Sequence, residues 1–449
     1  MLQIGESYAC NLPAQIPVFF KQSLPFHETM KFSLTSTLIL SAALTISVFG
    51  RNGQVQPAPT PSRVIVTSTL PPAKPVSTPA PRPVQTPVIV SSTPVPNQAP
   101  QVSNINRSGL SFSQIKAKIA EARRMMQVRP LTTASTESIS PVFPNSLIRI
   151  AFYDWRTRQI DNVVLSKEQF LTPSVPSSVV AASGKQFTVT TVRANGVNTP
   201  VTIVDPSGQQ QLPLIVQYPR ENNGVFQEMA YYVSTHAGLI TPEVVNAGQF
   251  YVRNTIEIAR ERLRERGIAI QPKVADIAER LATVEHVDHL RFRTEYHPNI
   301  YNDIFTLYAL NEGQTYRYSV SSAGAGGMVQ MIPSTYRMVR SRFPGVYLMP
   351  DFVEGMRDHV NAAKAMLLYM QMTWNDLIAS PTVANALQTG IATPEQLMAA
   401  GYNSNPAKIP GYINRGGQNW TTLIPRETKI YLQIYESLER AVPMAARKQ

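Results

Sequence analysis

The chain has 449 residues, with 41 lysines and arginines against 29 aspartates and glutamates, so its formal net charge is +12. This length suffices for two or three domains, and 43 % apolar residues excludes a wholly disordered chain. The single cysteine, Cys10, excludes a disulfide scaffold and a cysteine-rich metal site. The positive charge favours a polyanionic or membrane-adjacent partner without distinguishing among nucleic acid, lipid and cell wall.

The N-terminal part of the chain has the pattern of a leader followed by a spacer. Residues 1–29 do not resemble the start of an export signal, so we expect the native chain to begin at Met30. A lysine and a short apolar run then predict a signal peptide or membrane anchor over 30–50. Residues 51–112 are rich in proline, threonine and serine and predict a disordered, extended linker. We therefore expect export to the periplasm or cell envelope, with residues 31–50 as a membrane tether if the signal is not cleaved.

The middle of the chain changes from helical to alternating periodicity. Residues 113–128 have helical spacing and predict one short helix. Residues 145–235 predict a small antiparallel β domain with strands at 148–152, 187–192, 214–218 and 229–233. The pair Asn195-Gly196 predicts a tight hairpin turn, because both residues tolerate positive φ. This region shows no catalytic constellation, so packing against the next domain is its expected role.

From residue 236 to residue 445 the pattern is helical. Apolar-periodic helices are expected at 255–267, 273–286, 302–312, 360–374 and 430–442. Pro333 and Thr335 follow a glycine-rich stretch, which predicts a tight loop leading into a further helix. We therefore expect a multidomain α+β protein whose C-terminal domain is mainly α-helical.

Three motifs occur in this helical region. Residues 321–333 are Ser-Ser-Ala-Gly-Ala-Gly-Gly-Met-Val-Gln-Met-Ile-Pro, residues 400–406 are Ala-Gly-Tyr-Asn-Ser-Asn-Pro, and residues 425–431 are Pro-Arg-Glu-Thr-Lys-Ile-Tyr. Their order and content resemble the soluble-lytic-transglycosylase-like domains of the lysozyme superfamily. The corresponding family motifs are Ser-Pro-x-Gly-Ala-x-Gly-Leu-Met-Gln-x-x-Pro, Ala-Tyr-Asn-x-Gly-Pro and Pro-x-Glu-Thr-x-x-Tyr. The resemblance implies a lysozyme-like catalytic domain over 236–445.

The chain also departs from the family pattern at four positions. Ser322 replaces a proline, Val329 replaces a methionine, Gly401 is inserted before Tyr402, and Asn405 stands where a glycine is usual. These departures indicate a divergent member of the family.

The resemblance also implies an activity. Such enzymes cleave the bond between N-acetylmuramic acid and N-acetylglucosamine in peptidoglycan glycan strands, form a 1,6-anhydro sugar, and use one glutamate and no cofactor. Carried over by motif position, the resemblance implies that the substrate-binding residues are Ser321, Met328, Gln330, Tyr402, Asn403 and Glu427.

Spacing selects the expected catalytic glutamate. In the family the acid usually lies nine residues before the motif serine, and Glu312 is nine before Ser321. The apolar helix before Glu312 would place its carboxyl beside apolar side chains and at the negative end of a helix dipole. Both raise the pKa of a carboxyl, as a general acid requires. Glu285 is the weaker alternative, because it also ends an apolar helix but lies much farther from Ser321.

Several other functions remain as alternatives or are disfavoured. A catalytically inactive peptidoglycan-binding scaffold and a hydrolytic muramidase on the same fold are the two alternatives. The spacing of His286, His289 and His297 does not match a metal-binding motif, so no metal is expected. Basic residues are not interleaved with aromatic residues on one face, which disfavours nucleic acid as a partner.

Overall fold

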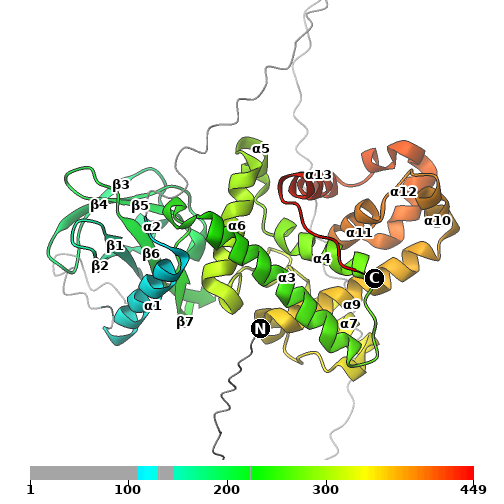
Figure 1. Ribbon diagram of the computed structural model, residues 1–449, viewed down its shortest axis with the longest axis horizontal. Coiled ribbons are helices and arrows are strands. Elements are labelled where there is room, and N and C mark those ends of the chain that lie inside the picture. Colours follow the sequence, from blue (N-terminus) through cyan, green and yellow to red (C-terminus); the bar gives the residue numbers. More distant parts are fainter. Residues whose placement is uncertain (1–108, 130, 132–145, 223, 449) are drawn as a thin grey trace, which may run out of the picture. The chain divides into compact units, whose positions relative to one another are not determined.

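The computed structural model describes residues 109–129, 131, 146–222 and 224–448. All of them belong to one compact unit that begins at residue 92. The expected leader over 30–50 and nearly all of the expected linker over 51–112 lie outside the described ranges. The described chain is mixed α and β, with the strands preceding most of the helices (Figure 1). None of its described helices is both long and apolar enough to cross a bilayer.

The β part contains two small antiparallel sheets. The first has the strand order β2-β1-β6-β7 and the second has the order β3-β4-β5. Their bounds are β1 (Leu147–Asp154), β2 (Gln159–Ser166), β3 (Pro176–Val180), β4 (Gln186–Thr191), β5 (Val201–Val204), β6 (Leu212–Asn222) and β7 (Val225–Val233). The four strands expected from alternation are all present, as β1, β4, β6 and β7.

Strand β1 shows why alternation alone would mislead about its exposure, because all eight of its residues are buried. Its odd and even positions face different neighbours, as the two-residue period of a strand requires. Phe152 packs in a T-shaped contact against Phe187 of β4, at a centroid distance of 4.8 Å. Ala151 instead shares a cluster with Ile115 of the expected short helix, which forms as α1 (Phe112–Val128).

The predicted tight turn at Asn195-Gly196 is wrong, although the strands on either side of it do pair. β4 and β5 are antiparallel neighbours, but nine residues, 192–200, connect them. Asn195 has φ −154°, so the two central residues do not form a type I′ turn, and Gly196–Asn198 forms a 3₁₀ turn instead. The longer connection places its side chains beside the helical part.

The helical part is built around α9, whose buried face consists largely of alanine, methionine and leucine. The longer helices are α3 (Pro242–Arg264), α4 (Pro272–Val284), α6 (His297–Asn311), α7 (Pro333–Arg342), α9 (His359–Ile378), α11 (Pro394–Asn403) and α13 (Arg426–Ala441). The shorter helices are α2 (Lys167–Leu171), α5 (His289–Thr294), α8 (Phe352–Arg357), α10 (Pro381–Gln388) and α12 (Ile409–Gly416).

All five expected helices form, with shifted ends. The largest shift is in α3, which begins at Pro242 instead of 255 because Thr241 caps it by accepting a hydrogen bond from the Val244 amide. Pro333 occupies the first turn of α7, as expected.

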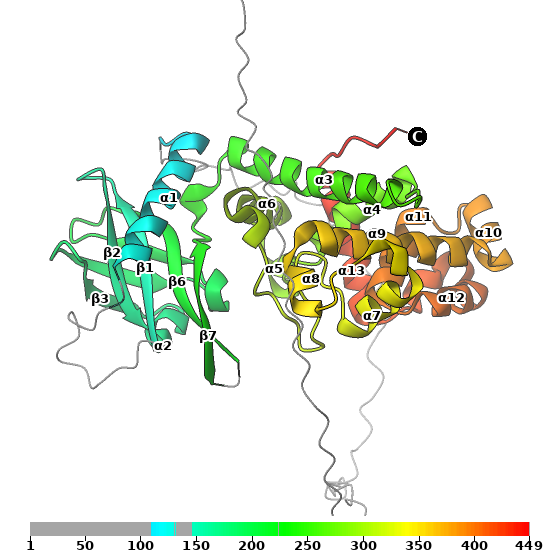
Figure 2. The same cartoon turned by 90° about the horizontal axis from the view of Figure 1, so that it is seen from below.

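Two buried hydrogen bonds join the β part to the helical part. The Val233 amide at the end of β7 donates to Asn311 Oδ1 at the end of α6, at 3.0 Å. The Tyr316 amide donates to the Tyr232 hydroxyl at 2.9 Å. Figures 1 and 2 both show α6 next to β7. The segment that follows α6 is therefore held against the sheet.

Candidate active site

The glycine-rich loop, residues 319–332, is closed by its own hydrogen bonds. Ser321 accepts the Gly324 amide with its carbonyl at 2.9 Å and the Ala325 amide with its side-chain oxygen at 3.0 Å. Gly327 has φ +67°, and a Cβ on it would lie 2.3 Å from the Met356 carbonyl oxygen. No other residue fits there, because both the backbone angle and the close approach require glycine.

Two side chains attach this loop to other helices. His286, just past the end of α4, donates from Nε2 to the Met328 carbonyl at 3.0 Å. Tyr402 of α11 donates from its hydroxyl to the Val329 carbonyl at 2.6 Å. The first and second motifs are therefore in direct contact, and the loop lies against the C-terminal end of α4.

Glu285 caps the C-terminal end of α4, and its carboxyl meets the third motif. The Tyr431 hydroxyl of α13 donates to Glu285 Oε1 at 2.5 Å. Burial raises the pKa of Glu285 from its ordinary value of 4.5 to about 8. The bond from Tyr431 opposes this rise, and the negative charge of Glu427 adds to it. The residue as a whole is only partly buried, whereas its carboxyl is desolvated, so the carboxyl is protonated at neutral pH.

The prediction that the Glu312 carboxyl lies beside apolar side chains is wrong. Glu312 does follow the last residue of α6, but its side chain is 54 % exposed and forms an ion pair with Lys116 of α1 at 2.6 Å. The helix ends against the β part, where α1 supplies a cation in place of an apolar wall. None of the hydrogen bonds or ion pairs that the structure shows for the Glu312 side chain joins it to the three motifs.

The remaining expected site residues divide into three groups. Met328 is completely buried, so its side chain presents no surface to the expected substrate. Ser321 and Gln330 support the loop; Gln330 Nε2 donates to the Gly327 carbonyl at 2.8 Å. Asn403 and Glu427 belong to the neighbourhood of Glu285: Asn403 Oδ1 accepts from Thr428, the residue after Glu427, at 2.8 Å.

Sequence reasoning gave Tyr431 and His286 no place in the site. Tyr431 is the last residue of the third motif, and this position could have indicated a place in the site. A tyrosine in a helix is usually a core residue, however. His286 is stacked on Tyr316 with ring centroids 3.3 Å apart. Burial lowers the pKa of His286 to about 3, so the ring is neutral and its Nε2–H can hold the loop carbonyl.

The inserted glycine of the second motif has a packing reason. Gly401 lies on the buried face of α11. A Cβ on it would lie 3.2 Å from Pro406 Cβ and 3.5 Å from atoms of both Ile409 and Thr373. The small residue lets α11 approach α9 and the following turn closely, which sets the position of Tyr402.

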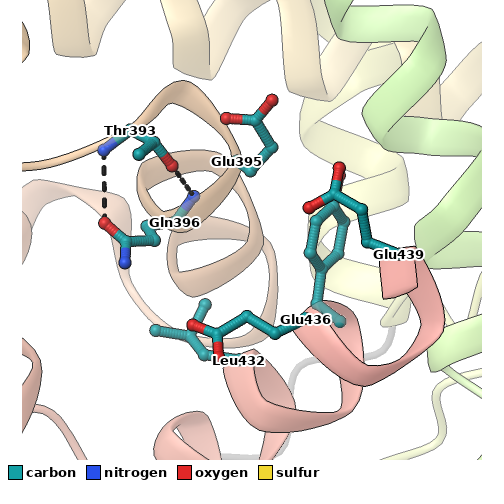
Figure 3. Close-up of a pocket in the computed structure, with 7 residues that line it drawn as sticks. Thr393, Glu395, Gln396, Leu432, Glu436 and Glu439 are labelled. Atoms are coloured by element: carbon teal, nitrogen blue, oxygen red, sulfur yellow. Dashed lines mark hydrogen bonds between the residues drawn. The ribbon is translucent and has the colours of Figure 1, made fainter. Parts of the chain in front are cut away.

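A separate pocket of about 330 Å³ lies between α11 and α13, and none of the residues that line it belongs to the three motifs (Figure 3). Its walls carry Glu395, Glu436 and Glu439. Glu395 pairs with Lys273, and Glu439 approaches Arg280 at 3.6 Å, so two of the three carboxylates are neutralised. This acidic surface contains no expected site residue.

Comparison of the chain with known protein families, characterised proteins and solved structures finds no match. The described residues contain no group of three or more histidine, cysteine, aspartate or glutamate side chains placed to hold a metal ion.

Proposed function

We propose that the chain is a peptidoglycan lytic transglycosylase with a lysozyme-like catalytic domain, in which Glu285 is the single acid and base. The observation that carries the proposal is the Glu285 carboxyl, whose pKa is raised to about 8 and which accepts a hydrogen bond from Tyr431 of the third motif, next to His286, which holds the loop of the first motif. The proposed substrate is the glycan strand of the cell envelope. The basic chain suits this substrate, because peptidoglycan carries carboxylates.

In the first step Glu285 protonates the oxygen that links N-acetylmuramic acid to N-acetylglucosamine. A carboxyl with this pKa is protonated at neutral pH and so starts in the required state. As the bond breaks, Glu285 becomes a carboxylate, and the Tyr431 hydroxyl, already 2.5 Å from Oε1, stabilises the new charge.

In the second step the muramyl 6-hydroxyl attacks the oxocarbenium-like carbon, and Glu285 takes the hydroxyl proton. Glu285 thus gives up one proton in the first step and regains one in the second, and no water is consumed. Glycosidases that hydrolyse their substrate usually place two carboxyl groups across the bond. Glu427 is the nearby second acid, and its negative charge at rest serves to keep Glu285 protonated.

Groups next to Glu285 provide contacts to the sugars. Asn403 uses Oδ1 to accept from Thr428, which leaves its Nδ2 as a donor for a sugar oxygen. Tyr402 is held by its bond to Val329, so the ring position is fixed before substrate binds. The exposed Ser321 lies at the mouth of the loop.

The test is digestion of purified peptidoglycan by the full chain, with released muropeptides read by mass spectrometry. We expect products lighter by one water than hydrolytic products, released about a thousandfold more slowly by the Glu285→Gln variant. Products with reducing ends would replace the proposal with a hydrolytic muramidase. Binding to intact peptidoglycan without any released product would replace it with a non-catalytic scaffold.

A further inference from the structure

A second and larger cavity lies between the β part and helices α5 and α6. Its volume is about 1180 Å³, above the range of about 300–1000 Å³ that is usual for small-molecule sites. The β4–β5 connection and the segment before β6 form one wall, and α5 and α6 form the other. A cavity of this size accommodates a short peptide or oligosaccharide.

The wall formed by the β part is rigid. Asp205 Oδ1 accepts from the amide of Ser207 at 2.9 Å and from that of Gln209 at 3.0 Å, which fixes the turn before β6. Gln211 is buried; its Oε1 accepts the Trp155 amide at 2.9 Å, which places Trp155 at the cavity. The surface is therefore formed before any ligand binds.

This wall presents two unused donors. The half-buried Arg193 guanidinium makes no hydrogen bond or ion pair with any residue in the described ranges. Burial, together with the nearby Arg291, lowers the pKa of Arg193, and the carboxylates of Glu295, Asp303 and Asp288 oppose this lowering without forming an ion pair with it. His236 accepts the Gly238 amide on Nδ1 at 3.0 Å; burial lowers its pKa to about 4, so the neutral ring carries its proton on Nε2.

The opposite wall is acidic at its edge. Arg291 binds Asp303 at 2.6 Å and Glu295 through two nitrogens at 2.8 and 2.9 Å. The Glu295 side chain is 38 % exposed and lines the cavity, with both of its carboxylate oxygens accepting from Arg291. The cavity thus offers a cation on one wall and an anion on the other.

We propose that this cavity binds the zwitterionic stem peptide of a peptidoglycan strand, with Arg193 and His236 receiving a peptide carboxylate and Glu295 receiving the side-chain ammonium. The inference rests on the proposed function for the nature of the ligand. A bare glycan strand carries lactyl carboxylates but no cation, whereas a stem peptide carries both charges that the two walls would bind. The β part would then select strands by their peptides while the helical part cleaves the glycan.

The test is calorimetric titration of the full chain with the tetrapeptide L-alanyl-γ-D-glutamyl-L-lysyl-D-alanine. We expect Arg193→Gln to weaken binding about tenfold, since a charge-assisted hydrogen bond is lost, and Glu295→Gln to weaken it less. The matched control is Arg158→Gln, which changes an exposed arginine of the same part outside the cavity and should leave binding unchanged. The same tetrapeptide with amidated carboxylates should bind weakly to every variant.

Digestion of peptide-free glycan strands separates this inference from the proposed function. Loss of tetrapeptide binding by Arg193→Gln with unchanged anhydro-product release supports both. Tetrapeptide binding through Arg193 by a chain that releases no anhydro product supports the peptide site and overturns the enzyme. An unmodified chain that does not bind the tetrapeptide, or an Arg193→Gln variant that binds it equally well, overturns the peptide site.

Discussion

The ends of helices α4 and α6 look alike in sequence and differ in the folded chain. Each helix is rich in buried apolar residues and is followed directly by a glutamate, Glu285 or Glu312. At α4 the carboxyl meets Tyr431, and the next residue, His286, holds the glycine-rich loop. At α6 the carboxyl meets Lys116 and solvent. The two carboxyls occupy the same position at a helix end. Burial raises the pKa of Glu285, whereas Glu312 forms a surface ion pair.

The backbone differs as well. Glu285 continues the helix with φ −58°, whereas Glu312 has φ +47° and ψ −126°, a region that glycine prefers. Glu285 is therefore held by ordinary helical geometry with its side chain directed to partners, while Glu312 has a strained backbone and a solvent-facing side chain.

The largest expected effect is on turnover. Glu285→Gln should lower anhydro-product release about a thousandfold, because general acid–base catalysis contributes about 10²–10⁴ in rate. Glu312→Gln is the matched control and should keep activity within about twofold, because it loses only an exposed ion pair. Initial rates on purified peptidoglycan measure both. The reverse outcome would restore the assignment based on spacing and remove Glu285 from the mechanism.

The second prediction concerns stability. The pKa of Glu285 is about 8 in the folded chain against an ordinary 4.5, so the folded state holds a proton that the unfolded state releases between these values. The resulting stabilisation is complete below about pH 4.5 and is lost as pH rises to 8, at up to about 1.4 kcal/mol per pH unit.

Urea unfolding of the unmodified chain and of Glu285→Gln at pH 5, 6.5 and 8 measures this loss. As pH rises, the free energy of unfolding of the unmodified chain should fall relative to that of Glu285→Gln. The pKa of His286, lowered to about 3, affects both proteins equally and cancels in the difference. A difference that does not vary with pH would show that Glu285 titrates normally.

The sequence predicted the elements better than it predicted their contacts. Periodicity gave α1, five of the longer helices and the strands β1, β4, β6 and β7, because each must present an apolar face. It could not show that the β part meets α6 through Asn311, which directs Glu312 toward α1. The three motifs were found in order, but Tyr431 reaches Glu285 only because α13 packs beside α4, a contact between residues 146 positions apart.

The third prediction concerns two variants near Glu285, which should shift the pH profile of activity in opposite directions. Tyr431→Phe removes a donor that favours the Glu285 carboxylate, so the alkaline limb of activity should move to higher pH. Glu427→Gln removes a negative charge and should move the limb to lower pH, each by up to about one unit. Tyr435→Phe is the matched control, because its buried hydroxyl has no hydrogen-bond partner among the described residues. Equal profiles for all three variants would exclude Glu285 as the titrating acid.

The smallest expected effect is a gain in stability at the other helix end. Glu312→Gly removes backbone strain of about 1–3 kcal/mol. It costs up to about 1 kcal/mol in unfolded-chain entropy and at most about 1 kcal/mol from the exposed ion pair with Lys116. The net gain should be about 1 kcal/mol in thermal or urea unfolding. Lys116→Gln separates the terms, because it removes the ion pair and keeps the strain, and should lower stability by less than about 1 kcal/mol. A stability loss from Glu312→Gly larger than that from Lys116→Gln would mean that the carboxyl holds the end of α6 in place, and the contrast between the two glutamates would then be one of structural role as well as chemistry.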